Sequence, residues 1–197
     1  MENPLEEKTV VLIKPDGVRR GLSGEIISRL EKTGLKIVAL KMLQPTRERV
    51  KKHYPSKKEW IEGLGKKSLS DYKKNGLDPI KMIGTDEPLK IGEMCMEWLF
   101  DYVASGPVIA IIFQGNDAVN QVRKLVGNTI PAFAEAGTIR GDYSKDSPIL
   151  ANLQKRGVKN VIHASGSKEE ADFEIKHWFE PKEIVSYRRA DEEVMFA

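Results

Sequence analysis

The sequence predicts an α+β fold in which helices pack on one face of a mostly antiparallel sheet. Four short apolar or β-branched runs indicate strands, and segments with helical spacing of apolar residues lie between them. The order along the chain is strand, helix, strand, helices, strand, helix, strand and helix, which is typical of this class. Because no linker or repeat divides residues 1–197, we expect a single domain.

The first strand is predicted at residues 9–13, a β-branched run that ends at Lys14. The Pro-Asp-Gly composition of residues 15–17 indicates a turn, so Lys14 should stand at the carboxyl end of the strand. Ser23 can cap the helix that follows, and residues 35–43 are predicted as the second strand.

The next segment combines a short helix with a long insertion. Thr46 can cap a charged helix that Pro55 ends. Residues 56–93 are rich in Lys, Gly and Asp and have weak periodicity, so an insertion with limited helix content is expected. Such a segment has little apolar surface of its own, and it should pack against neighbouring helices or a neighbouring subunit.

Helical spacing returns at residues 93–104, and the apolar run 108–113 predicts a buried strand. Asn116 can cap the next helix, whose apolar face carries three valines, and Gly127 can end it. These elements complete the pattern expected for the central part of the sheet.

A polar loop is predicted from residue 128 to about 159, with its extended part at 143–159. Loops of this length are usually functional or disordered. An apolar pair then leads into His163, which should end the last strand at a sheet edge. Ser167 opens a capping box and a helix that continues to Trp178.

Composition limits the classes of function. The formal net charge of +3 is spread through mixed-sign segments, which argues for neither a nucleic acid nor a membrane partner. Cys95 is the only cysteine, so no internal disulfide can form, and a buried thiol in a reducing compartment is expected. The acidic start at residues 1–8 has no apolar leader, and a cytoplasmic protein is therefore predicted.

His163 is the candidate nucleophile, although a lone histidine after apolar residues is more often structural. Lys14, Arg123 and Arg140 could point to the same sheet edge, and the alternative for each is a solvated surface charge. Their convergence would form a polyphosphate site, since guanidinium groups bind phosphate in a bidentate manner. No phosphate-binding loop or dinucleotide fingerprint is present, so side chains must hold any nucleotide.

Several motifs stand in an order that resembles the nucleoside diphosphate kinase family. They are residues 11–18 with Arg20-Gly21, His53-Tyr54, 105–108, Arg123 with 127–129, 137–142 and 160–165. The resemblance covers about 8–54 and 97–189. It implies a ferredoxin-like βαββαβ sandwich with a four-stranded antiparallel sheet. It also implies Mg²⁺-dependent, ping-pong transfer of the terminal phosphate of a nucleoside triphosphate to a nucleoside diphosphate through a phosphohistidine.

The resemblance also assigns roles to individual residues. His163 matches the phosphorylated residue, and Ser165 and Glu174 match the pair that orients its imidazole. The positions that match those holding phosphates and ribose are Lys14, Tyr54, Arg123, Thr129, Arg140 and Asn160. The Mg²⁺ ion is expected on the nucleotide phosphates rather than on protein ligands. Taken without the family, Glu174 would be a solvated helix acid, Thr129 a turn residue, Asn160 a loop end and Tyr54 a packing residue.

The chain departs from the family pattern at Gly166, where members usually have an acidic residue near the metal's water shell, and at the insertion. The insertion leaves the base-stacking residue open: counting from His53-Tyr54 gives Trp60, and counting back from Gly106-Pro107 gives a position near Cys95. Trp60 could equally pack inside the insertion. No Asn/Asp pair is placed to read a base edge, so weak base selectivity is expected.

The segment around Ile130-Pro131 matches the family loop that makes subunit contacts, which implies a homo-oligomer, a tetramer or a hexamer. A second candidate is a nucleotide-binding relative that lacks efficient turnover and acts through its insertion. A third is an RNA-binding module, but the sequence lacks the aromatic sheet motif that stacks bases.

Overall fold

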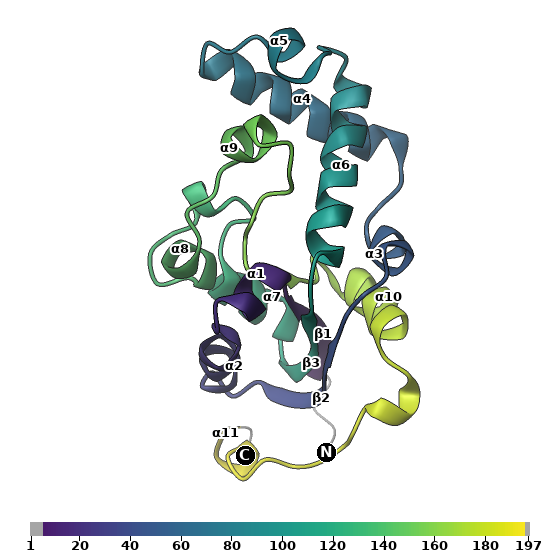
Figure 1. Cartoon of the computed structure of the whole chain (residues 1–197). Helices are drawn as coiled ribbons and strands as arrows, with labels where there is room; N and C mark the ends of the chain where they lie inside the picture. Colours follow the sequence, from purple (N-terminus) through teal and green to yellow (C-terminus); the bar gives the residue numbers. More distant parts are fainter. Residues whose placement is uncertain (1–5, 196–197) are drawn as a thin grey trace.

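The computed structural model describes residues 6–195, so part of the N-terminal stretch considered above lies outside the described residues. Its centre is the four-stranded antiparallel sheet that the family resemblance implied, and the strand order is β2-β3-β1-β4 (Figure 1). The strands are β1 (Glu6–Ile13), β2 (Lys36–Leu43), β3 (Val108–Asn116) and β4 (Ile162–Ala164). None of the helices within residues 6–195 is long and apolar enough to span a membrane.

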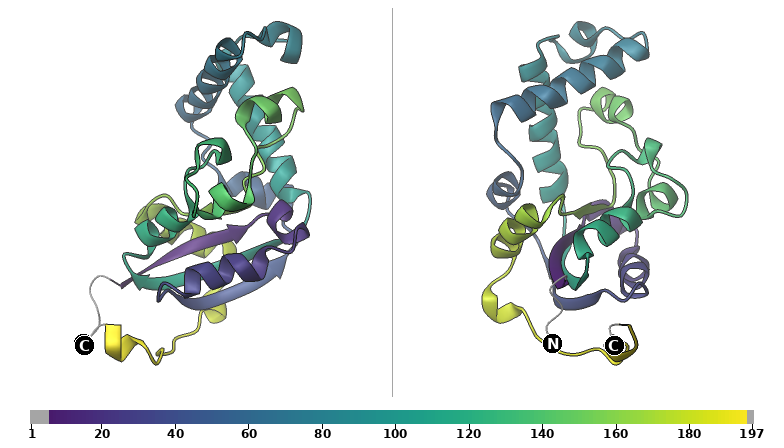
Figure 2. Two further views of the ribbon diagram at one scale, coloured as in Figure 1. Left: turned by 90° about the vertical axis from the view of Figure 1, so that its left-hand side faces the viewer. Right: turned by 180° about the vertical axis from the view of Figure 1, so that it is seen from behind.

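Helices cover both faces of the sheet, and the prediction of helices on one face is therefore wrong (Figure 2). Val10 and Leu12 of β1 pack into one core cluster, and Val11 and Ile13 pack into another. A strand that is apolar at successive positions is buried on both faces, since its side chains alternate. One side is covered by α2 (Ser23–Glu31) and α7 (Ala118–Val126), and the other by α3 (Arg47–His53), α6 (Pro88–Ala104) and α10 (Lys168–Trp178).

Three local predictions are wrong by a few residues. Ser23 is the first residue of α2 and not its cap, because Leu22 stands at the N-cap and no side chain caps the helix there. The expected turn after Lys14 is a short helix, α1 (Pro15–Arg19), because proline suits the first position of a helix, where no hydrogen-bond donor is needed. Asn116 belongs to β3, and Asp117 stands at the N-cap of α7. Thr46 caps α3 as predicted and accepts a hydrogen bond from the backbone of Arg49.

The polar loop at 128–159 is partly helical. It contains η1 (Pro131–Phe133), α8 (Ile139–Tyr143) and α9 (Pro148–Leu153). Thr138 and Ser147 cap α8 and α9 by accepting hydrogen bonds from backbone N–H groups three residues on. After α10, the chain continues through η2 (Pro181–Glu183) to α11 (Glu192–Met195).

The insertion is mainly helical, and the expectation of limited helix content is wrong. It consists of α4 (Lys58–Lys74) and α5 (Pro79–Ile83), and with α6 it forms a long hairpin at the opposite end of the molecule from the described termini (Figure 1). Gly65 and Gly92 allow α4 and α6 to touch. A Cβ atom on Gly65 would lie 1.7 Å from the carbonyl oxygen of Pro88, and one on Gly92 would lie 2.0 Å from that of Ile61.

The hairpin has a small apolar core of its own. Tyr72, Ile83 and Ile91 are buried in it, and Trp98 of α6 and Ile149 of α9 pack against them. The expectation that this segment packs against neighbouring helices is confirmed. The glycines that weaken the helical pattern in the sequence are thus the residues that bring the helices together.

We predict that Gly65→Ala lowers the free energy of unfolding by about 1–3 kcal/mol, because the added methyl group overlaps the Pro88 carbonyl. Gly63→Ala is the matched control: it is on the same helix, has no atom within 4 Å of its added Cβ, and should stabilise α4 by about 0.5–1 kcal/mol. Urea unfolding followed by circular dichroism measures both. Equal effects of the same sign would contradict the packing described here.

Candidate active site

The site is centred on His163, in the middle of the short strand β4. Its side chain is 17% exposed, and its Nε2 lies 2.8 Å from Oε1 of the buried Glu174 on α10. Ser165 donates a hydrogen bond to the other carboxylate oxygen, at 2.7 Å, and accepts one from the backbone N–H of Val10, at 3.0 Å. A neutral imidazole in this place donates Nε2–H to Glu174, which leaves the lone pair on Nδ1.

A strained turn precedes β4. Val161 has a φ of 55°, in the left-handed region that a β-branched residue rarely adopts. The N–H of Ile162 donates to the carbonyl of Asn160 at 2.6 Å, which closes a γ-turn. Gly17 of α1 packs directly against this turn: a Cβ at Gly17 would lie only 2.9 Å from the Val161 carbonyl oxygen. Backbone strain of this kind persists where the surroundings fix it, and here it sets the direction in which β4 starts.

Lys14 and Asn160 link that turn to the loop after α7. Lys14 Nζ donates to Asn160 Oδ1 at 2.7 Å, and Asn160 Nδ2 donates to the carbonyl of Thr129 at 2.9 Å. Lys14 is buried, and this burial, followed by the nearby Arg140 charge, lowers its pKa to about 7. Thr129 lines the cavity, and its contact with Asn160 is through its backbone carbonyl.

Arg140 is a buried cation from α8. Its Nη1 and Nη2 donate to the carbonyls of Gly127 and Ile162, both at 2.8 Å, and its Nε has no partner within residues 6–195. Burial and the adjacent Arg123 lower the pKa of Arg140 to about 10. Cations this close together repel one another. A phosphate bound between them would reduce the repulsion and accept hydrogen bonds from donors that have no partner.

The same cations keep His163 neutral. Burial, and then the charges of Lys14, Arg140 and Arg123, hold the pKa of His163 well below its ordinary value. A neutral imidazole has a free lone pair at pH 7 and is a nucleophile without losing a proton. The arrangement therefore places a nucleophilic nitrogen beside an anion-binding end of the site.

Tyr54 also reaches this region. Its hydroxyl is buried with no hydrogen-bond partner in the described part of the chain, and burial raises its pKa. The neighbouring His53 packs its ring edge-on against His163, with ring centroids 4.5 Å apart, and accepts a hydrogen bond from Trp178 at Nδ1. No sequence pattern predicted the contact between His53 and His163, because it depends on how α3 and α10 pack against each other.

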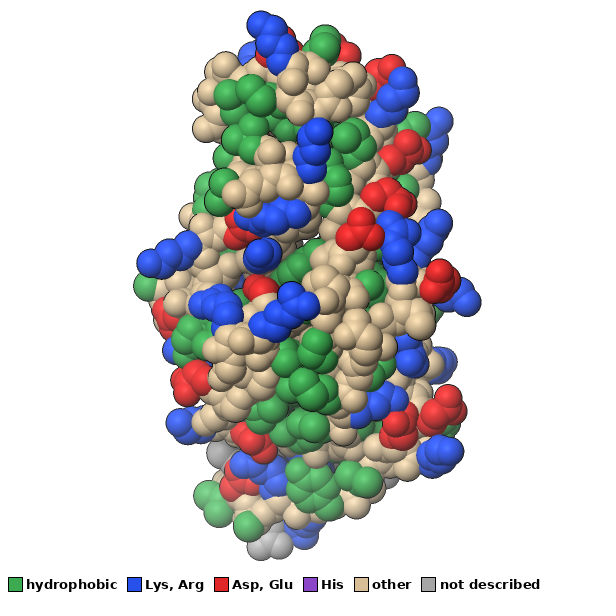
Figure 3. Space-filling view, in the orientation of Figure 1, with side chains coloured by type: hydrophobic (Ala, Val, Ile, Leu, Met, Phe, Trp, Pro, Cys, Tyr) green, Lys and Arg blue, Asp and Glu red, His purple; other side chains and the backbone are tan. Residues whose placement is uncertain are grey.

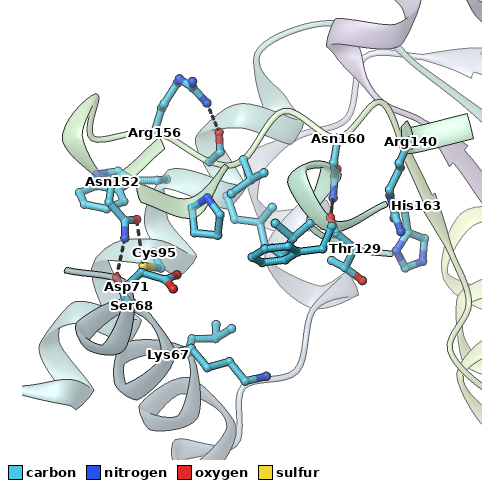
Figure 4. A pocket seen from close by; sticks show the side chains of 18 of the residues that line it. Lys67, Ser68, Asp71, Cys95, Thr129, Arg140, Asn152, Arg156, Asn160 and His163 are labelled. Atoms are coloured by element: carbon cyan, nitrogen blue, oxygen red, sulfur yellow. Dashed lines mark hydrogen bonds between the residues drawn. The ribbon is translucent and has the colours of Figure 1, made fainter. Parts of the chain in front are cut away.

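A cavity of about 510 Å³ extends from His163 to the hairpin (Figure 4). Figure 3 shows lysine and arginine side chains around a hollow in the middle of the molecule. The predicted residues that line the cavity are His163, Lys14, Tyr54, Arg123, Thr129, Arg140, Asn160 and Trp60. Ser165 and Glu174 lie behind His163 rather than in the wall. The cationic residues that were expected to share a sheet edge thus line one cavity.

Trp60 and Cys95, the two positions left open for base stacking, both line the cavity. Trp60 is 39% exposed and is not part of the hairpin core. Cys95 is only partly buried, and this burial raises the pKa of its thiol to about 11, so that the thiol is largely protonated and unreactive at neutral pH. Trp98 lines the same cavity, whereas the sequence indicated only that it belongs to the helix predicted at residues 93–104.

The absence of a side chain at Gly166 leaves space that the carboxylate of Glu170 occupies. Its N–H donates to Oε2 of Glu170 at 2.7 Å, and a Cβ on Gly166 would lie 2.6 Å from the same oxygen. Glu170 therefore places a negative charge beside the position where the sequence lacks one. The sequence marked Glu170 only as part of a helix cap.

A family model described as "Nucleoside diphosphate kinase" matches residues 7–62 and 90–184. The chain is 51% identical over 179 residues to a nucleoside diphosphate kinase of Pyrobaculum aerophilum, covering 91% of this chain and 98% of the relative. It is 39% identical to one from Archaeoglobus fulgidus, covering 96% and 97%.

Two solved structures are also similar. A crystal structure of an NDP kinase from Pyrobaculum aerophilum has a TM-score of 0.88 at 49% identity, covering 92% of this chain and all of that one. A transition-state mimic of nucleoside-diphosphate kinase from Borrelia burgdorferi, with bound vanadate and ADP, has a TM-score of 0.75 at 36% identity, covering 96% of both chains.

The pKa of Lys14 leads to a prediction about stability. Between the folded value of about 7 and the ordinary value of 10.5, the unfolded chain binds a proton that the folded chain does not. The wild type should therefore gain stability relative to Lys14→Met as the pH rises from about 7 to 10.5, by at most about 1.4 kcal/mol per pH unit, and the difference should level off below pH 7, where both states are protonated. Urea titrations in phosphate-free buffer measure the difference.

The control for this prediction is Lys124→Met, at an exposed position on α7. A Lys14→Met difference that stays constant from pH 7 to 10.5 would contradict the buried, desolvated lysine.

Proposed function

Since the chain belongs to the nucleoside diphosphate kinase family and transfers phosphate between nucleotides, we propose that His163 carries the phosphate in a ping-pong reaction. The observation that supports this most strongly is the neutral imidazole of His163, which Glu174 orients at the cationic end of the cavity. The similar protein from Borrelia burgdorferi binds vanadate and ADP as a transition-state mimic, which agrees with phosphoryl transfer at such a site.

In the first step, the Nδ1 lone pair of His163 forms a bond to the terminal phosphorus of a nucleoside triphosphate. The bond from that phosphorus to its bridging oxygen breaks, and the nucleoside diphosphate leaves with the electron pair. A terminal oxygen of a second nucleoside diphosphate then attacks the phosphohistidine and restores His163. Glu174 accepts the Nε2–H hydrogen bond throughout and stabilises the positive charge that develops on the ring, and Ser165 holds the carboxylate.

The surrounding groups act on the phosphate. The transferring phosphoryl group disperses negative charge over its oxygens, so preplaced cations supply much of the stabilisation. We assign this role to Lys14, Arg123 and Arg140. The hydroxyls of Tyr54 and Thr129 and the amide of Asn160 are assigned to the remaining phosphates and to the ribose, because these three residues line the same cavity as the cations.

The metal belongs on the nucleotide. Within residues 6–195, the one group of three or more His, Cys, Asp or Glu side chains close enough to share an ion is His53, His163 and Glu174. Two imidazoles suit Mg²⁺ poorly, since it prefers oxygen ligands and water. The phosphates would therefore hold the ion, which would neutralise phosphate charge when bound, and Glu170, beside Gly166, is the carboxylate that we assign to its water shell.

We further propose that Trp60 stacks on the base, because it is a large aromatic side chain that lines the cavity from the start of α4 and is 39% exposed. A homo-oligomer, a tetramer or a hexamer, is proposed from two exposed apolar features. Phe133 is 69% exposed beside Pro131, and the edge strand β2 exposes Leu40 and Met42. The single cysteine supports a cytoplasmic location.

Two other functions fit less well. A binding relative without turnover would not need the intact contacts between His163, Glu174 and Ser165. An RNA-binding module of this kind would need an open sheet face on which bases stack, and helices cover both faces of this sheet.

We predict that His163→Ala forms no acid-labile phosphoprotein with radiolabelled ATP and loses exchange between ATP and other diphosphates, since neither His53 nor His177 lines the cavity. His177→Ala is the matched control and should retain both activities, because that residue bonds to the Arg49 carbonyl on α3. Acid-labile label in His163→Ala would show that another residue accepts the phosphate.

A second prediction concerns the metal. Glu170→Gln should raise the Mg²⁺ concentration for half-maximal exchange about two- to fivefold, a modest effect because the carboxylate is exposed and screened. Glu169→Gln makes the same charge change at the adjacent helix position and should leave the titration unchanged. Identical Mg²⁺ titrations for the wild type and Glu170→Gln would remove Glu170 from any metal role.

A further inference from the structure

One hydrogen bond behind the cavity wall joins α6 to α1. Tyr102, near the end of α6, is 8% exposed, and its hydroxyl donates to Oδ1 of Asp16 in α1 at 2.5 Å. Figure 1 shows α1 beside the lower end of α6. Neither residue lines the cavity, so any effect of this bond on the reaction must act through a neighbouring residue.

The neighbouring residue is Val161, because Asp16 uses both of its carboxylate oxygens. Oδ1 accepts the bond from Tyr102, and Oδ2 accepts one from the backbone N–H of Val161, at 3.3 Å. The carbonyl of Val161 accepts a bond from the backbone N–H of Lys14, at 2.9 Å. The two peptide groups of Val161 are thus both held by residues 14–16.

Val161 needs this support because its backbone is strained. A φ of 55° is unfavourable for a β-branched residue and persists only where neighbouring groups fix it. His163 follows two residues later and pairs with Leu12 of β1. A change in the backbone at Val161 would therefore change the direction from which the imidazole meets a phosphate.

Tyr102 is suited to be a fixed support. Burial, and then the charge of Asp16 and the bond to it, raise the pKa of Tyr102 well above its ordinary value, although the backbone of Asn160 acts in the opposite direction. The phenol therefore keeps its proton at neutral pH and remains a donor. The ring lies 5.5 Å from Lys14 Nζ, and a Cβ on Gly157 would lie 3.0 Å from the Tyr102 Cβ.

We propose that Tyr102 is a positioning residue for His163. Its hydroxyl fixes the carboxylate of Asp16, and Asp16 holds the strained Val161 turn from which β4 begins. This inference rests on the proposed function. Attack on phosphorus needs a close and well-aligned nitrogen, so a small misplacement lowers the rate of the chemical step more than the affinity for the nucleotide.

The test measures single-turnover phosphorylation of His163 by radiolabelled ATP in a rapid-quench instrument. Tyr102→Phe removes the hydroxyl and keeps the ring beside Lys14. We expect its rate constant to fall about tenfold, with the ATP concentration for half-maximal rate within about twofold of the wild type. Tyr143→Phe is the matched control and should not change the rate. It also deletes a phenol hydroxyl that donates to a carboxylate, that of Glu25 at 3.1 Å, outside the cavity wall.

A second variant tests the path through Asp16. Asparagine has one acceptor oxygen for the two donors that Asp16 serves, so Asp16→Asn should also slow phosphorylation. In the double variant, with Tyr102→Phe, only the Val161 N–H needs that oxygen. We therefore expect the double variant to react no more slowly than Asp16→Asn alone, whereas two independent structural defects would multiply.

The outcomes separate the two proposals. A Tyr102→Phe enzyme that reacts at the wild-type rate or loses only ATP affinity, or two substitutions whose effects multiply, would overturn the positioning role and leave the proposed function intact. If the wild type forms no phosphoenzyme, the proposed function fails. Hydrogen exchange of the Val161 amide then tests the support of the turn by itself: Tyr102→Phe should speed it about tenfold, and Tyr143→Phe should not. Equal exchange in both variants would overturn that support.

Discussion

The hydrogen bond between His163 and the buried carboxylate of Glu174 is the contact on which the rest of the site depends. It fixes both the direction of the imidazole and the nitrogen that carries the proton. Its geometry requires α10 to pack on β1, which Ser165 secures by bonding to both Glu174 and the backbone of Val10. The sheet register and the chemistry of the nucleophile are therefore set by the same few contacts.

Charge in the cavity is arranged for an anion that arrives with the substrate. Lys14 and Arg140 are buried near one another. Burial lowers the pKa of each, and the charge of a neighbouring cation lowers it further. The same field keeps His163 neutral. The phosphates of a bound nucleotide would offset the unfavourable burial of these cations. Burying them therefore destabilises the free protein and strengthens nucleotide binding.

The sequence predicted the strands of the sheet and the cationic residues of the site, but it did not predict the helix packing that brings them together. The apolar runs of β1 and β3 predicted strands correctly. Because these runs are continuous, they also indicate burial on both faces, whereas we predicted helices on one face only. Gly65 and Gly92 hid the α4–α6 hairpin, because a glycine lowers helix propensity whether or not it makes a close contact. The strain at Val161 and the contact of Tyr102 with Asp16 depend on tertiary packing, which no local pattern reports.

The state of the His163 ring tests the account most directly. Nitrogen-15 NMR of the imidazole, in protein labelled at histidine, distinguishes the two neutral tautomers from the charged ring. The account predicts a neutral ring at pH 7 with the proton on Nε2 and a bare Nδ1, shifting to the other tautomer or to a mixture in Glu174→Gln. A protonated Nδ1 or a charged ring in the wild type at pH 7 would contradict it.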